Sequence, residues 1–239
     1  MDYLLLLSSI AAGALTVLVF RLGERGPLKR LNALAGGYLL TLTLLHLLPE
    51  LYHEHAAPGR ETHLVIGLLI LAGFFIQIAL DYFSMGIEHG HAHHFHNRFP
   101  VGIIVGLCLH AFLEATALGE AGSHHDTSSR ELLLWSIVIH NYPVSIALFG
   151  MLLHSGMTRN RALGWLALFA AMAPAGMLVS AHSPLANYSR ELMAVVIGIF
   201  MHISTTILFE TSESHRFNAQ KALAIGIGVG LGVLSVIFH

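Results

Sequence analysis

The chain has 239 residues, of which 55% are hydrophobic and only 11% are charged, and its mean hydropathy is +0.69. A soluble domain carries about 25% charged residues, so this composition excludes an ordinary soluble protein and predicts a multi-spanning membrane protein. The formal net charge of −2 is too small to imply a nucleic-acid partner or charge-driven binding to a membrane surface. A single cysteine, Cys108, excludes an intramolecular disulfide framework.

Eight apolar segments have the length that a transmembrane helix requires, roughly 20 residues. They lie near 2–21, 32–52, 63–86, 100–120, 131–154, 160–181, 188–210 and 219–238. The first segment has no basic stretch before it, so we expect a retained helix rather than a cleaved signal. The connections are short and polar, which predicts a single all-α transmembrane domain over residues 1–239 without a soluble domain.

Lysine and arginine in the connections predict the orientation, because cytoplasmic loops are enriched in both. With the N-terminus outside, the inside loops hold nine basic residues and the outside loops hold three. The inside residues are Arg21, Arg25, Lys29, Arg30, Arg98, Arg159, Arg161, Arg216 and Lys221, and the outside residues are Arg60, Arg130 and Arg190. We therefore expect both termini outside the cytoplasm of a multi-pass protein, in a bacterial inner membrane.

Two polar helix ends suggest internal symmetry. The second segment ends outside with His46-Leu47-Leu48-Pro49-Glu50, while the seventh carries His202 and ends inside with Glu210. Similar ends on opposite sides suit an inverted repeat of helices 1–3 and 6–8 around helices 4 and 5. Transporters commonly use such a repeat and place their site near the membrane midplane. The predicted fold is therefore an eight-helix 3+2+3 bundle.

The fourth and fifth segments carry the most informative polar side chains. His110 and Glu114 are four residues apart, so they stack on one helical face. Ionisable groups are expensive in hydrocarbon and normally mark a substrate, ion or proton path. Imidazole nitrogen and carboxylate oxygen can hold a divalent ion such as zinc, with His140 as a third ligand and Asn141 as a neutral oxygen. The structural alternative is a hydrogen-bonded pair that only locks two helices together.

Four features in this order resemble the ZIP family of divalent-metal transporters. They are the motif ending in Pro49-Glu50, a histidine-rich loop after the third segment, His-x-x-x-Glu in the fourth, and His-Asn-x-Pro in the fifth. The likeness covers the whole chain, including eight spans with both termini outside. It implies uptake of zinc, and often iron or manganese, into the cytoplasm. It also implies a metal site between helices 4 and 5, onto which His110, Glu114, His140 and Asn141 map.

The chain departs from this family at several positions. The fourth helix of the family usually reads His-Asn-x-x-Glu-Gly, but here Ala111 replaces the asparagine and Ala115 the glycine. The fifth usually reads His-x-x-Pro-Glu-Gly, but Val144 and Ser145 follow Pro143. In the sixth helix, Ala173-Pro174 lacks an acidic neighbour that the family often has. Without a carboxylate at Val144, we expect a single metal ion rather than a two-metal centre.

Three further pairs are expected to line the route of the ion. His46 and Glu50 share a face near the outside and suggest an entry relay. Gln77 and Asp81 share a face toward the inside and suggest an exit or proton step, while His202 and Glu210 are two turns apart on the seventh segment. Histidine-rich loops could gather ions, namely Glu88–His96 inside and His53, His55, His124, His125 and Asp126 outside. The alternatives are interfacial pairs and solvated loops.

Two other functional classes stay open from the residues alone. An intramembrane zinc-dependent hydrolase would use histidine ligands to activate a water molecule and a carboxylate as base. A haem-binding electron carrier would use His110 and His140 as axial ligands, although Glu114 argues against it. We expect a transporter rather than an enzyme, with no required cofactor and with the divalent metal as transported substrate. The expected partners are metal ions and lipid but no nucleic acid; a homodimer stays open.

Overall fold

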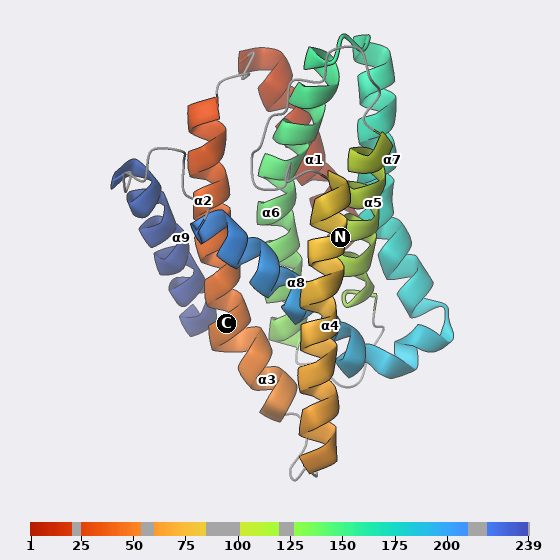
Figure 1. The fold of residues 1–239 in the computed structure, drawn as a ribbon, viewed down its shortest axis with the longest axis vertical. Coiled ribbons are helices and arrows are strands. Elements are labelled where there is room, and N and C mark those ends of the chain that lie inside the picture. The colour runs from red at the N-terminus through yellow and green to blue at the C-terminus, as the bar shows by residue number, and fades with distance from the viewer. Residues whose placement is uncertain (21–24, 54–59, 85–100, 120–126, 210–218, 239) are drawn as a thin grey trace.

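The computed structural model describes residues 1–20, 25–53, 60–84, 101–119, 127–209 and 219–238, and within these ranges the chain forms helices and no strands. The described elements are α1 (Asp2–Phe20), α2 (Arg25–Leu42), the π-helix η1 (Thr43–Leu47), α3 (Leu48–His53), α4 (Arg60–Ser84), α5 (Val101–Thr116), α6 (Thr127–His154), α7 (Arg159–Ala181), the 3-10 helix η3 (Pro184–Tyr188), α8 (Ser189–Phe209) and α9 (Ala219–Phe238). Figure 1 shows them as one bundle, in which α8 crosses obliquely behind α4 toward α2.

Seven of the described helical segments are long and apolar enough to cross a membrane. The second of them is continuous from Pro27 to His53 through α2, η1 and α3, and another combines η3 with α8. The prediction of an all-α, multi-pass membrane protein is confirmed. The eighth expected span corresponds to α5, which is apolar but has only 16 residues.

The short α5 ends at Thr116 rather than near residue 120, because the chain turns there. The backbone N–H groups of Leu118 and Gly119 donate to the carbonyls of Ala115 and Thr116, which closes the helix with a tight turn. At 1.5 Å per residue, 16 residues span only about 24 Å, less than the roughly 30 Å of a hydrocarbon core. Most of α5 is buried among other helices, so this helix lies inside the bundle rather than facing lipid along its length.

The second span contains a π-helical turn just before Pro49. The N–H of Leu48 donates to the carbonyl of Thr43, five residues earlier. Pro49 has no N–H, and in a regular α-helix its ring would clash with the carbonyl of Leu45. The wider π turn accommodates the proline, and such turns occur frequently at functional sites. It carries His46 on its last turn, next to Glu50 in α3.

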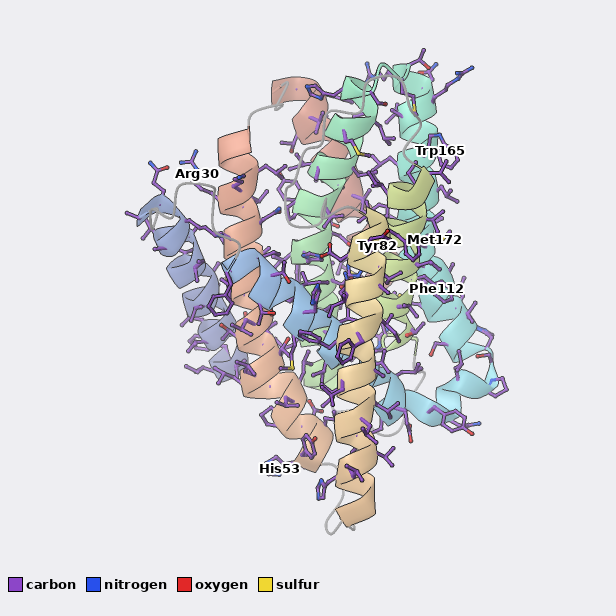
Figure 2. The ribbon with its side chains drawn as sticks, viewed as in Figure 1. Arg30, His53, Tyr82, Phe112, Trp165 and Met172 are labelled. Carbon is purple, nitrogen blue, oxygen red and sulfur yellow. The ribbon has the colours of Figure 1, made fainter. Side chains whose placement is uncertain are left out.

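The helices pair in a regular way. The most extensive contacts join α2 to α9, α4 to α8, α5 to α7 and α1 to α6. Glycine allows close approach in these pairings, as two of them illustrate. A Cβ atom on Gly176 of α7 would collide with the carbonyl of Phe112 in α5, and one on Gly13 of α1 would collide with the side chain of Ser145 in α6 and lie 3.0 Å from the carbonyl of Tyr142. In Figure 2, Phe112 and Met172 both lie where α5 meets α7.

Candidate metal centre

The structure brings together three potential ligands from the two central helices. His110 and Glu114 come from α5 and His140 comes from α6, and one ligand atom of each lies within 4.8 Å of the others. All three side chains are buried, with relative exposures of 0%, 0% and 1%. Within the described ranges, this is the one cluster of three or more histidine, cysteine or acidic residues with such spacing.

His110 and Glu114 face each other along α5, as their four-residue spacing predicts. The distance between His110 Nε2 and Glu114 Oε1 is 3.1 Å, and neither side chain is exposed. A carboxylate so far from water is costly unless a positive or hydrogen-bonding group compensates for it. A divalent cation between the imidazole and the carboxylate would provide that compensation.

His140 places a second imidazole beside the first. The ring centroids of His110 and His140 are 5.7 Å apart and the ring planes meet at 85°. Pro143, three residues further along α6, has no N–H to donate to the carbonyl of Ile139, so the hydrogen-bond ladder of α6 is interrupted next to His140. The helix nevertheless continues through the proline to His154.

Asn141 is also fully buried, and its side-chain amide needs hydrogen-bond or metal partners. Neither its amide oxygen nor its amide nitrogen has a hydrogen-bond partner among the described residues, and the same holds for Glu114 Oε2. Buried polar atoms are normally satisfied, and exceptions often mark an ion or water site. The carboxylate of Glu114 and the two imidazoles form a donor set that a divalent cation accepts, and Asn141 directly follows His140 in α6.

The position that carries a carboxylate in the resembled motif contributes no ligand in this chain. Val144 is 1% exposed and belongs to an apolar cluster that also contains Leu107 and Ala111 of α5. The hydroxyl of the following Ser145 donates to the carbonyl of Tyr142 at 2.7 Å. Glu114 is therefore the one carboxylate in the described metal cluster.

Gln77 of α4 contacts the metal centre directly, which the sequence reasoning did not foresee. Its Oε1 lies 3.0 Å from His110 Nδ1, and its side chain has 0% relative exposure. The sequence alone suggests an exit or proton step for Gln77 instead. Two features of the sequence point toward this contact. Gln77 is an amide in a largely apolar helix, and the second ring nitrogen of His110 needs a hydrogen-bond partner.

Asp81 and His202 form a separate polar contact between α4 and α8. His202 Nε2 lies 3.7 Å from Asp81 Oδ2, and its ring packs edge-on against Phe74 with centroids 5.1 Å apart. Asp81 follows Gln77 by one turn of α4, so the two share a face as expected. Glu210, the predicted neighbour of His202, lies outside the described residues.

His46 and Glu50 meet where η1 passes into α3. His46 Nε2 lies 3.3 Å from Glu50 Oε2, and both side chains are 21% exposed. His53 is exposed at the end of α3. The histidine-rich loop 88–96 and His55, His124, His125 and Asp126 lie outside the described residues, so the predicted gathering of ions by these loops stays a prediction.

Comparison with known proteins identifies a family. Residues 99–238, which include α5 and α6, match the family model of the ZIP zinc transporter. The chain is 28% identical to zinc transporter ZIP9 of Micropogonias undulatus, over 64% of this chain and 53% of that protein. It is 27% identical to zinc transporter ZIP9-B of Xenopus laevis, over 77% of this chain and 63% of that protein. The chain thus spans less than two thirds of the length of these relatives.

Proposed function

The chain belongs to the ZIP zinc transporter family, and from this premise we propose that it carries divalent metal cations across the membrane into the cytoplasm. Zinc is the first candidate, because the named relatives are zinc transporters and because imidazole with carboxylate suits this ion. Iron and manganese accept the same ligand types. The metal is the transported substrate in this proposal, and the membrane protein acts as carrier rather than as enzyme.

The buried cluster of His110, Glu114 and His140 carries the proposal. Its donor atoms come from two central helices of one chain and lie within 4.8 Å of one another. Structural zinc sites are closed by four protein ligands, whereas catalytic zinc sites keep one position open. Three protein ligands, with Asn141 or a water molecule completing the shell, would let an ion enter and leave. One carboxylate supports one dication at this site.

The two other polar contacts are proposed to mark the route. His46 and Glu50 are partly exposed near one end of the second span and would receive the ion from outside. Asp81 and His202 would receive it on the cytoplasmic side of the metal centre. Each contact offers imidazole and carboxylate, the donor types of the central cluster, so the ion would meet similar ligands along its path.

Uptake into proteoliposomes tests the proposal. Purified protein should accumulate radioactive zinc above the level of empty vesicles, and a Glu114→Gln variant should not. A matched control is Ser9→Ala, which removes a buried side-chain hydrogen bond within α1, a helix that carries none of the cluster residues. The proposal fails if vesicles with the wild-type protein take up zinc, iron, manganese and cadmium no faster than empty vesicles.

A further inference from the structure

We infer that Gln77 is a positioning residue of the metal centre: its amide oxygen accepts the Nδ1–H of His110 and so turns the Nε2 lone pair of His110 toward the metal. The inference rests on the proposed function and adds to it a group that does not itself bind the ion. The observation behind it is the 3.0 Å contact between Gln77 Oε1 and His110 Nδ1, in which both side chains have 0% relative exposure.

Gln77 lies where a side-chain amide without a hydrogen-bond partner would be destabilising. Most of α4 faces outward, with exposed side chains such as Phe75, Ile76 and Ile78 around this position. The buried stripe of the helix consists of Ile66, Gly73, Leu80 and Gln77, so one amide stands among apolar residues. Burying an amide without a partner costs several kcal/mol in an apolar medium, roughly 4–8 by the strictest scale. His110 provides a partner for this amide.

Both ring nitrogens of His110 face an acceptor, Gln77 Oε1 at Nδ1 and Glu114 Oε1 at Nε2, so a cation bound between Nε2 and Glu114 leaves the proton on Nδ1. A neutral imidazole carries one N–H and one lone pair, and an amide oxygen can only accept. With Nδ1–H donated to Gln77, the lone pair belongs to Nε2, which lies 3.1 Å from Glu114 Oε1 inside the cluster. The other tautomer would direct an N–H at the ion. A His110 that binds metal through Nε2 therefore carries its proton on Nδ1, and Gln77 Oε1 is positioned to accept that proton in a hydrogen bond.

A neutral acceptor also suits a site that must release its ion. Histidine ligands commonly donate their second N–H to a carboxylate, which fixes the ring and raises the basicity of the metal-binding nitrogen. An amide fixes the ring without a second negative charge near the cation. We therefore expect glutamine at this position to hold His110 in place at moderate affinity, and a carboxylate to bind metal more tightly and release it more slowly.

The first measurement is the Kd of the purified protein for cobalt, determined from the visible absorption of the bound ion. Gln77→Met keeps the volume but removes the acceptor, and we expect its Kd to rise about 10–100-fold, the usual effect of losing such a partner. Gln77→Glu restores an acceptor, and its Kd should be equal to or below that of the wild type, with slower maximal zinc uptake. Ser9→Ala should bind cobalt like the wild type.

These variants separate a positioning role from simple loss of fold. A purely structural role predicts that Gln77→Met and Gln77→Glu lose folded protein while the remainder binds cobalt normally. The inference is overturned if folded Gln77→Met has the wild-type Kd, or if Gln77→Glu binds as weakly as Gln77→Met. A wild-type protein that binds no cobalt would overturn the proposed function itself.

A second measurement needs no change at Gln77. Nitrogen NMR of protein with labelled histidine, compared with the spectrum of His110→Asn, isolates the signals of His110. In the metal-loaded wild type we expect the proton of His110 on Nδ1 and a metal-shifted Nε2 signal, because the ion occupies the place between Nε2 and Glu114. A metal-loaded His110 without a proton on Nδ1 would refute the inference.

Discussion

At the scale of single residues, Glu114 is the main electrostatic determinant of the proposed site. It is the one carboxylate of the described cluster and has no exposure to solvent. Two unit charges about 4 Å apart interact by roughly 4 kcal/mol at an effective dielectric constant of about 20, which corresponds to about 1,000-fold in affinity. Because a zinc ion carries two charges, we expect Glu114→Gln to weaken zinc binding by at least about that factor, as measured by competition with a chelating dye.

The histidine-rich loop provides the comparison for this prediction. Deletion of residues 89–96 should reduce zinc uptake less than Glu114→Gln does, because loop histidines would only raise the local ion concentration. If the deletion is the more damaging change, the metal centre lies elsewhere than between α5 and α6.

Valine at position 144 predicts that the metal centre binds a single ion. A glutamate there would lie one turn after His140, as Glu114 lies after His110, and two carboxylates could bridge two cations. Valine is buried in the apolar cluster with Leu107 and Ala111 and offers no ligand. Two dications sharing one carboxylate would repel by several kcal/mol or more. Anomalous diffraction from zinc-soaked crystals should show one ion at the centre; two fully occupied ions within about 4 Å would contradict this.

The sequence predicted the clustering of His110, Glu114 and His140 but not the contact of Gln77 with that cluster. His110 and Glu114 could be paired because spacing along one helix determines their contact. Pairing with His140 needed only the assumption that helices 4 and 5 face each other. The hydrogen bond from His110 to Gln77 joins α5 to α4, and no spacing rule connects residues 33 positions apart. Only the packing of the two helices brings them together.

At the scale of helices, contacts between glycine and backbone should dominate the stability of α4 on α8. A Cβ atom on Gly198 would collide with the carbonyl of Ile70 and lie 2.8 Å from the amide nitrogen of Phe74. Neither atom can move without moving α4, and overpacking of this kind costs about 1–3 kcal/mol. We expect Gly198→Ala to lower the Tm in detergent by about 2–10 °C.

Gly230→Ala is the matched control for that change. Gly230 also lies within a membrane helix, α9, but a Cβ atom there would meet nothing within 4 Å. Its Tm should stay at or slightly above the wild-type value, because alanine favours a helix over glycine. Equal losses in both variants would show that helix packing at Gly198 is looser than described.

Helix positions could be predicted from the sequence because hydropathy and length constrain spans strongly, but their internal details could not. The early end of α5 depends on a turn at Leu118 and Gly119 and on neighbours that shield α5 from lipid. The π turn at Thr43–Leu47 is a local response to Pro49. Neither feature changes the hydropathy pattern, so neither is visible in it.

At the scale of the whole molecule, the helix pairings have the symmetry that an inverted repeat requires. If α1, α2 and α4 correspond to α7, α8 and α9, and α5 to α6, then the pair α1–α6 corresponds to α7–α5 and the pair α2–α9 to α8–α4. These are the four most extensive pairings.

The glycine contacts follow the same correspondence. A Cβ atom on Gly13 would lie beside Ser145 and 3.0 Å from the carbonyl of Tyr142, two residues after His140, and one on Gly176 would collide with the carbonyl of Phe112, two residues after His110. We therefore propose that the two histidines are equivalent positions of the repeat, which would place the metal on its symmetry axis.

Three contacts between distant segments agree with the expected topology. Asp2 and Arg130 form an ion pair with Oδ2 and Nη2 2.6 Å apart, and Arg190 donates to the carbonyl of Leu51 at 3.3 Å. In the topology expected from the basic residues, all four lie at the outer side. Arg30 and Gln220, joined by a 3.4 Å hydrogen bond, both lie at the inner side. If one of these spans ran in the opposite direction, the two residues of its contact would be expected on opposite sides of the membrane.

The absolute orientation can be tested with single cysteines. Arg30 and His53 are exposed and lie near opposite ends of the second span, as Figure 2 shows. With Cys108 replaced by alanine to remove background, His53→Cys should react with a membrane-impermeant maleimide on intact cells. Arg30→Cys should react only after the membrane is permeabilised, because the excess of basic residues in the loops on that side predicts that they lie in the cytoplasm. The reverse pattern would invert the topology, and His46 and Glu50 would then lie on the exit side rather than the entry side of the metal centre.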